Sequence, residues 1–507
     1  MGNGNEFGLT IAETTFEGVE VLARPQPNAT IDYGSLIYIT LQRSKTAREA
    51  IQTMAHLMDT HGYYSSGESF SLSDSTTGEV WIMEVIGTGP SYSRAGSVWV
   101  AQRIPDGMVC AHANQARITT FPRNDPDNCL YSPDVVDVAV QYGLYELNHN
   151  GDDSGFSFSD VYAPLTFMSA RSGEARVWSI FSALADPHGD FAAEYVEYAT
   201  GRDLTNRMPL WIEPFQKVTF DDVVEVLSSH FEGTELDSSI DVGSGLYGVP
   251  ARPRPLNWKY KGKTYFNERT VGIPKTGWTF IAQVRPWMPS ELGVVLWFAV
   301  DDSSTSPRVP IYASSREIPQ AYAGVGPQDG VQSTILQWDM SKAFWVQNMV
   351  ANLAYFRWSD VYPILRDKIQ QVHDTFKDDL ASADAQAVML YDKKGPAAAI
   401  EFVSGFGVKA GDSLQAEWIE VYGKLFVRFR DFYTTVKDET KPDCGCTVEE
   451  VGMSDEWKKR IVDETKHRYR VKGDDDDDDG DGDALGESGW RRKHGTAVSD
   501  WTDRSLY

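Results

Sequence analysis

Hydrophobic and polar residues alternate with two different periods over the first 120 residues. Within 44–62, Ala47, Ile51, Met54 and Met58 recur at helical spacing, and Gly62 stands where such a helix would stop. This segment predicts an amphipathic helix with Ser44 as its N-cap. Short apolar runs between turn residues predict strands at 8–12, 34–43, 68–74, 78–87, 97–105 and 107–118. Strands in such quick succession favour antiparallel meanders over parallel units.

The later part of the chain mixes both periods. Further strands are predicted at 176–184, 278–286 and 292–301. Residues 338–376 are predicted to be helical with a break near Pro363, and a second helical stretch is predicted at 413–438. No repeat of 20–50 residues is visible. The pattern therefore predicts an α+β fold.

Composition and charge narrow the function classes. The chain has 507 residues, 41% hydrophobic and 12% aromatic, which is typical of a folded globular protein. Its net charge of −26 argues against nucleic acid or an anionic membrane as the main partner, since both need basic patches. No apolar run approaches the length of about 18 residues that a membrane span needs. The compartment and the oligomeric state stay open.

The C-terminal segment differs in character from the rest. Residues 441–507 include an acidic run at 474–479, which predicts a disordered acidic tail after a folded region at 1–440. Asp475, Asp477, Asp479 and Gly480 fit the first half of a calcium loop, but Glu487 falls one residue late for the final ligand. A solvated tail is therefore the preferred interpretation, and no metal site is predicted.

The cysteines and histidines form no metal or protease motif. Cys444 and Cys446 are too close for half of a zinc knuckle, and are interpreted as a pair of loop thiols. Cys110 and His112 share one face of a predicted strand, so a nucleophile pair is one interpretation. Side chains on one strand point in parallel, and a buried structural cysteine is the preferred alternative.

Three polar clusters at predicted strand ends remain as candidates for chemistry. They are 5–8, 112–117 and 174–178. Asparagine amides are suitable donors to an oxyanion, and arginine can hold a carboxylate. Satisfied turns or caps are the preferred interpretation of such clusters, and spacing alone does not overturn it.

Taken in order, these clusters resemble the dipeptidase A family of cysteine peptidases, relatives of the secernins among the N-terminal-nucleophile hydrolases. The resemblance rests on "NEFGLTIAETT", "SKTAREAIQTMAHLMDTHG", "GESFSLSDSTTGEVWIMEVIG", "SVWVAQRIPDG", "AHANQARI" and "EARVWSIF". It continues in "ERTVGIPKTGWTFIAQVRPWMP" and "AFWVQNMVANLAYFRW". It implies a four-layer αββα sandwich at 1–440 that hydrolyses dipeptides without a cofactor. The nucleophile would be the thiol of an N-terminal cysteine, with the free α-amine as proton acceptor.

The resemblance also assigns site residues. Asn5 matches the asparagine of the "NExGL" motif, an oxyanion-site residue, and Asn114 matches a later asparagine beside the nucleophile. Arg176 matches an arginine that steadies the pocket. Arg117 is a candidate for substrate binding.

The chain departs from the family at its beginning. In the family, the nucleophilic cysteine lies well upstream of the "NExGL" strand, whereas here the first cysteine is Cys110. We therefore expect the chain to be N-terminally incomplete, to lack the first strands and to be inactive as given. Any signal peptide would lie in the missing segment. The alternatives are a secernin-like protein without enzymatic activity and an amidase that acts on N-acyl substrates.

Overall fold

The computed structural model describes residues 2–24, 26, 28–251, 257–324, 336–450 and 452–471. Contacts divide the chain into two compact units, Met1–Val451 and Gly452–Tyr507. In the second unit the described residues include helix α13 (Asp455–Glu464), capped by Ser454. The acidic run at 474–479 and the calcium-loop residues considered above lie outside the described residues.

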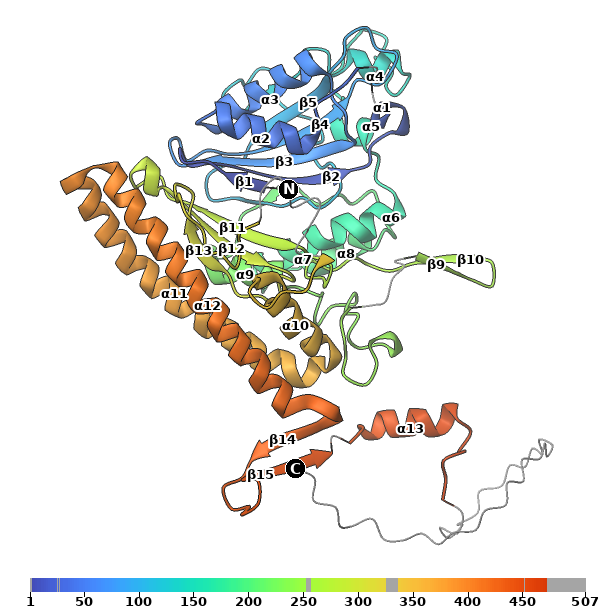
Figure 1. The fold of residues 1–507 in the computed structure, drawn as a ribbon. Helices are drawn as coiled ribbons and strands as arrows, with labels where there is room; N and C mark the ends of the chain where they lie inside the picture. Colours follow the sequence, from blue (N-terminus) through green and yellow to red (C-terminus); the bar gives the residue numbers. More distant parts are fainter. Residues whose placement is uncertain are drawn as a thin grey trace. The chain divides into compact units, whose positions relative to one another are not determined.

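A six-stranded antiparallel sheet forms the N-terminal part of the first unit, in the order β1-β2-β3-β4-β5-β7. Its register pairs Leu9 with Asp74 and Phe70 with Met83. Side chains alternate across it, so Leu9, Phe70 and Met83 join one core with α2 and α3, which cover that face (Figure 1). The strands are β1 (Gly2–Gly4), β2 (Leu9–Phe16), β3 (Gly67–Asp74), β4 (Val80–Gly87), β5 (Ser97–Arg103) and β7 (Cys129–Tyr131). The predicted antiparallel arrangement is confirmed.

Helix α2 (Tyr33–Arg43) replaces the strand predicted at 34–43. Asp32 caps it by accepting a hydrogen bond from the Ser35 amide at 2.6 Å. Its buried residues, Leu36, Ile37, Thr40 and Leu41, follow a helical period. The run of Ile and Tyr residues suggested a strand, but the cap and the packing against the sheet outweigh that propensity.

Helix α3 (Ala47–His61) confirms the predicted amphipathic helix, with Gly62 as its C-cap at φ 68°. Its N-cap, however, is Thr46, which forms a capping box with Glu49. Ser44 instead ends α2, and its hydroxyl bonds Thr53 at 2.8 Å. The predicted cap was therefore two residues early, because Thr46 has the glutamate at the N3 position.

A second sheet packs against two long helices. It contains β11 (Trp278–Val284), β12 (Val294–Val300) and β13 (Val309–Tyr312), all antiparallel. Helices α10 (Ala343–Phe356), α11 (Trp358–Lys394) and α12 (Pro396–Phe429) share one core with it (Figure 1). The strands predicted at 278–286 and 292–301 are confirmed. The helix break lies at Arg357, and Pro363 is inside α11.

The strand predicted at 176–184 is instead helix α7 (Ala175–Leu184), preceded by a π-helical turn at Ala170–Glu174. Ala175, Trp178 and Phe181 are buried at helical spacing. A short run that is apolar on almost every side does not distinguish a strand from a buried helix, which explains the error.

Most of the strand predicted at 107–118 is a loop. Only β6 (Val109–Cys110) pairs, with β8 (Trp211–Ile212). Asn114 has φ 56°, which a strand does not allow, and the Glu84 carboxylate accepts the amides of Arg117 and Ile118 at 2.5 and 3.0 Å. The loop is therefore held by a buried side chain in place of a neighbouring strand.

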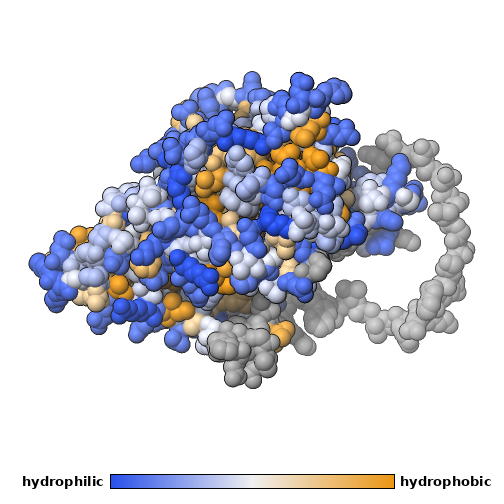
Figure 2. All heavy atoms as spheres, turned by 90° about the horizontal axis from the view of Figure 1, so that it is seen from above, coloured by the Kyte–Doolittle hydropathy of each residue, from blue (hydrophilic) through white to orange (hydrophobic). Residues whose placement is uncertain are grey.

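Shorter elements complete the first unit. They are α1 (Glu20–Ala23), α4 (Asp137–Gln141), α5 (Phe158–Tyr162), α6 (Phe167–Ser169), α8 (Phe191–Ala199), α9 (Phe220–Leu227), β9 (Asn257–Tyr260), β10 (Lys263–Phe266), β14 (Tyr433–Lys437) and β15 (Cys446–Glu450). Every helix in the described part of the chain is too short or too polar to cross a bilayer. Figure 2 shows hydrophilic side chains over most of the face seen from above, with a group of hydrophobic ones among them.

Candidate functional site

Asn114 joins three separate parts of the chain. Its Nδ2 donates to the Thr15 carbonyl at the end of β2, at 2.5 Å. Its Oδ1 accepts from Arg176 Nη2 at 2.8 Å and from Arg269 Nη1 at 3.4 Å. The backbone at Asn114 is left-handed, a conformation that asparagine adopts more readily than most residues other than glycine.

Arg176 reaches this point from α7. Its Nε donates to the Ser172 carbonyl at 2.8 Å, and Nη2 also contacts the Ala113 carbonyl at 3.3 Å. Burial, with the neighbouring Arg269 guanidinium, lowers the pKa of Arg176 to about 9. None of these bonds uses Nη1. Two guanidiniums around one amide make the point electropositive, which suits a carboxylate or a developing oxyanion.

Glu68 of β3 extends the cluster. Its Oε1 accepts from the Thr15 hydroxyl at 2.9 Å, so Glu68, Thr15, Asn114 and Arg176 form a continuous chain of contacts. The Glu68 side chain is fully buried, and burial raises its pKa to about 7, against the opposing hydrogen bond from Thr15. A carboxyl that titrates near neutral pH is typical of functional sites.

This pKa predicts a pH effect on stability. The folded state holds a proton on Glu68 between the ordinary value of 4.5 and about 7, so stability falls as pH rises through that range. Glu68→Gln should therefore reduce the loss of unfolding free energy between pH 5 and 8 by about 2–3 kcal/mol, measured by urea unfolding. Glu420→Gln, at an exposed position, is the control. Equal pH dependence in wild type and Glu68→Gln would contradict the assignment.

His112 lies beside the cluster and is engaged at both ring nitrogens. Nδ1 is 2.6 Å from the Thr14 hydroxyl, and Nε2 is 2.7 Å from the Ser71 hydroxyl. Burial, together with Arg117 and Arg176, lowers its pKa to about 4. Burial also raises the pKa of the Cys110 thiol to about 12. A neutral histidine and a neutral thiol favour the structural interpretation of this pair.

Arg117 is occupied by protein groups. Its Nε lies 3.2 Å from both carboxylate oxygens of Glu174, and both side chains are almost fully buried. Its other nitrogens donate to the carbonyls of Ala111, Pro209 and Leu210. These contacts fix the 111–117 loop against the chain around 210.

Asn5 lies apart from the other predicted site residues. Its Nδ2 donates to the carbonyls of Leu41 and Ser44 at 2.8 Å, and its Oδ1 accepts from the amides of Phe7 and Leu9. Strand β2 separates it from Thr15 by about 20 Å at the usual rise per residue. The structure therefore brings Asn114 and Arg176 into contact and leaves Asn5 at the other end of β2. Arg117 lies in the same loop as Asn114, three residues further along the chain.

A cavity of about 620 Å³ adjoins His112 through Ser71. Its other walls come from β4, from the loop before β6, and from helices α7 and α9. They include Ile82, Ile104, Cys110, Ile180 and Val226. The lining is mostly apolar, so the cavity can accommodate an apolar group next to the polar cluster.

Sequence reasoning missed Glu68, Glu84 and Arg269. Glu84 stands inside the apolar run "VWIMEVIG", and a lone acid in such a run is a signal of a buried functional or positioning role. Glu68 begins a strand and gives a weaker signal of the same kind. Arg269 carries no local signal, because its approach to Asn114 depends on the tertiary fold.

The remaining cysteines are not available as thiolates. Burial raises the pKa of the Cys129 thiol to about 12. Cys444 and Cys446 are joined in a disulfide, which replaces the pair of thiols predicted there. The described residues contain no group of three or more His, Cys, Asp or Glu side chains that could hold a metal ion.

Comparisons with known proteins agree with the resemblance. Residues 2–371 match the profile described as "Peptidase family C69". The chain is 24% identical to "Dipeptidase A" of Lactobacillus helveticus, over 73% of this chain and 67% of that protein. It is 26% identical to "Probable dipeptidase A" of Streptococcus pyogenes serotype M3 (strain SSI-1), over 69% of this chain and 65% of that protein. The match thus spans about two thirds of the length of these relatives. The chain belongs to peptidase family C69.

Proposed function

We propose that this chain belongs to a cysteine-type dipeptidase. Its membership of a peptidase family carries the proposal, and relatives named as dipeptidases support the substrate class. The α-amine of an N-terminal cysteine accepts the proton of its own thiol, and the resulting thiolate attacks the peptide carbonyl. The peptide C–N bond breaks, the second amino acid leaves with the proton on its amine, and water then hydrolyses the thioester to release the first amino acid. No cofactor takes part.

We assign the binding of the developing oxyanion to Asn114 and the electropositive environment to Arg176. Asn114 Nδ2 has two protons, of which one bonds Thr15, and within the described residues Arg176 donates to Ser172, Ala113 and Asn114 through Nε and Nη2. Asn5 is proposed as a further oxyanion-site residue and Arg117 as a substrate-binding residue. The side chains of Asn5 and Arg117 already bond to protein groups. A variant of each residue is therefore needed to test its role, in addition to a variant of Asn114.

The fold assigned to this function is the four-layer αββα sandwich. Helices α2 and α3 on the first sheet, and α11 and α12 on the second, supply candidate outer layers. The two sheets approach at β1, where a methyl group added to Gly2 would lie 2.6 Å from Phe280. The division into a domain at 1–440 and an acidic tail at 441–507 stays a prediction; the compact unit defined by contacts extends to Val451.

The nucleophile is proposed to be none of the four cysteines in the sequence. Cys110 and Cys129 are neutral thiols with raised pKa values, and Cys444 and Cys446 are bonded to each other. The attacking thiol would then belong to a segment that the 507 residues do not contain.

An activity assay tests this proposal. Protein isolated from its natural source should release free amino acids from dipeptides, and should do so faster than from N-acyl amino acids. The 507-residue chain expressed alone should release none, with or without Cys110→Ser. Preference for N-acyl substrates would favour the amidase alternative, and no hydrolysis by the natural protein would favour the non-enzymatic one.

A further inference from the structure

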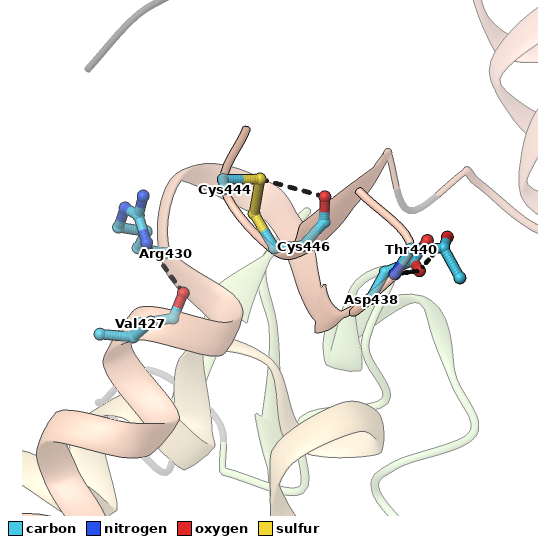
Figure 3. Close-up of a disulfide and its surroundings, with 6 residues drawn as sticks. All are labelled: Val427, Arg430, Asp438, Thr440, Cys444 and Cys446. Carbon is cyan, nitrogen blue, oxygen red and sulfur yellow. Dashed lines mark hydrogen bonds between the residues drawn. A yellow bond between two sulfur atoms is a disulfide. The ribbon is translucent and has the colours of Figure 1, made fainter. Parts of the chain in front are cut away.

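The hairpin after α12 carries the Cys444–Cys446 disulfide, in a region beyond the family match at 2–371. Strands β14 and β15 pair antiparallel over five residues, with Lys437 opposite Cys446. Residues 438–445 form the connecting loop, and Figure 3 shows the two sulfur atoms joined at its end. Arg357, the residue between α10 and α11, contacts β14. It donates to the Tyr433 carbonyl at 2.7 Å and to the Thr434 hydroxyl at 3.1 Å.

Gly445 makes this short bridge geometrically feasible. It has φ 63°, a left-handed conformation that brings the Cα atoms of Cys444 and Cys446 to 5.2 Å, within the usual range for a disulfide. The Asp438 amide donates to the Gly445 carbonyl at 2.7 Å, and the Gly445 amide donates to the Lys441 carbonyl at 3.1 Å. The loop is therefore ordered around the disulfide.

The disulfide contributes little to the stability of the fold. It closes a ring of only three residues, so it removes little entropy from the unfolded chain. The strand pairing and Arg357 hold the hairpin without it. Cys444 is exposed and Cys446 is half-buried, so an attacking thiol can reach the bond. Exposed disulfides without a structural role are the ones that exchange.

We propose that Cys444–Cys446 is a thiol–disulfide exchange site that oxidises external thiols. A thiolate attacks Cys444 Sγ, the Sγ–Sγ bond breaks, and Cys446 leaves as a thiolate. A second thiolate attacks the external sulfur of this mixed disulfide and releases Cys444 as a thiolate. Protons from the solvent convert both to thiols. Two external thiols become one disulfide, and the protein disulfide is reduced to a dithiol.

Charge around the hairpin selects the class of thiol. Between 437 and 450 there are five carboxylates and only two lysines. Attraction then favours a cysteine in a basic peptide over an anionic thiol such as glutathione, more strongly at low salt.

Thiol exchange on the full chain, followed by alkylation and peptide mass spectrometry, tests the proposal. The isolated protein should carry the disulfide, and a basic cysteine peptide should reduce it severalfold faster than an acidic one. A glutathione redox buffer should bring the pair to a measurable equilibrium between disulfide and dithiol. A pair that is fully reduced after isolation in air, or that only excess dithiothreitol reduces, would overturn the proposal.

Gly445→Ala provides a second readout that needs no external peptide. Alanine clashes with nothing within 4 Å at this position but disfavours the left-handed backbone, so the equilibrium should move about tenfold toward the dithiol. Gly262→Ala, at φ 76° in the β9–β10 turn and equally open, is the matched control and should leave the equilibrium unchanged. If the two variants showed the same equilibrium between disulfide and dithiol, the left-handed backbone at Gly445 would not be what favours the disulfide.

Discussion

Glu174→Ala should lower the free energy of unfolding by about 3–5 kcal/mol, because it leaves the buried Arg117 guanidinium without its carboxylate. The two side chains are 1% and 3% exposed, so water does not replace the lost partner. Urea unfolding followed by circular dichroism measures the change.

Two further variants show whether the effect comes from the unpaired charge. The double replacement Arg117→Met with Glu174→Leu removes the unpaired charge and should recover part of the loss. The recovery is incomplete because the carbonyls of Ala111, Pro209 and Leu210 lose their donor. Glu197→Ala breaks the exposed pair with Arg202 and should cost less than about 1 kcal/mol. A small effect of Glu174→Ala would contradict the assignment of a stabilising buried ion pair between Arg117 and Glu174.

Asn114→Asp should lower kcat for dipeptide hydrolysis about 100- to 1000-fold in the catalytically active protein. The change removes an amide donor and adds a negative charge where the oxyanion forms. Aspartate tolerates φ 56° and can pair with Arg176 and Arg269. It loses the hydrogen bond to the Thr15 carbonyl, so a urea unfolding curve is measured beside kcat to separate a loss of stability from a loss of chemistry. Steady-state kinetics on one dipeptide checks the result.

The controls for Asn114 separate chemistry from folding. Asn150→Asp, at an exposed position, should leave kcat unchanged. Asn5→Asp should reduce kcat only if Asn5 shares the site, and its contacts with Leu41 and Ser44 predict a loss of stability as well. An unchanged kcat in Asn114→Asp would remove this residue from the proposed mechanism.

The sequence predicts the elements whose periodicity is strong. The amphipathic stripe of α3 and the short runs of β3, β4 and β5, bounded by turn residues, lead directly to the observed helix and strands. The errors at α2 and α7 occur where a run is apolar on most sides. There, the Asp32 cap and the buried surface around Trp178 decide the structure, and neither is visible as a period.

The candidate site divides in the same way. Resemblance alone indicated Asn114 and Arg176, and the structure brings them into contact at 2.8 Å. Glu68 and Arg269 join them through strand pairing and loop position, which residue types and spacing do not encode. Likewise, the saturation of the Arg117 guanidinium by Glu174 and three carbonyls follows only from the folded chain.

Identification of the reactive thiol tests the central claim most directly. Active protein from the natural source is treated with a dipeptide-based chloromethyl ketone until hydrolysis stops, and the labelled peptide is identified by mass spectrometry. The account predicts one labelled cysteine, at an N-terminus, in a peptide absent from the 507-residue sequence. A label on Cys110 that parallels the loss of activity would contradict it.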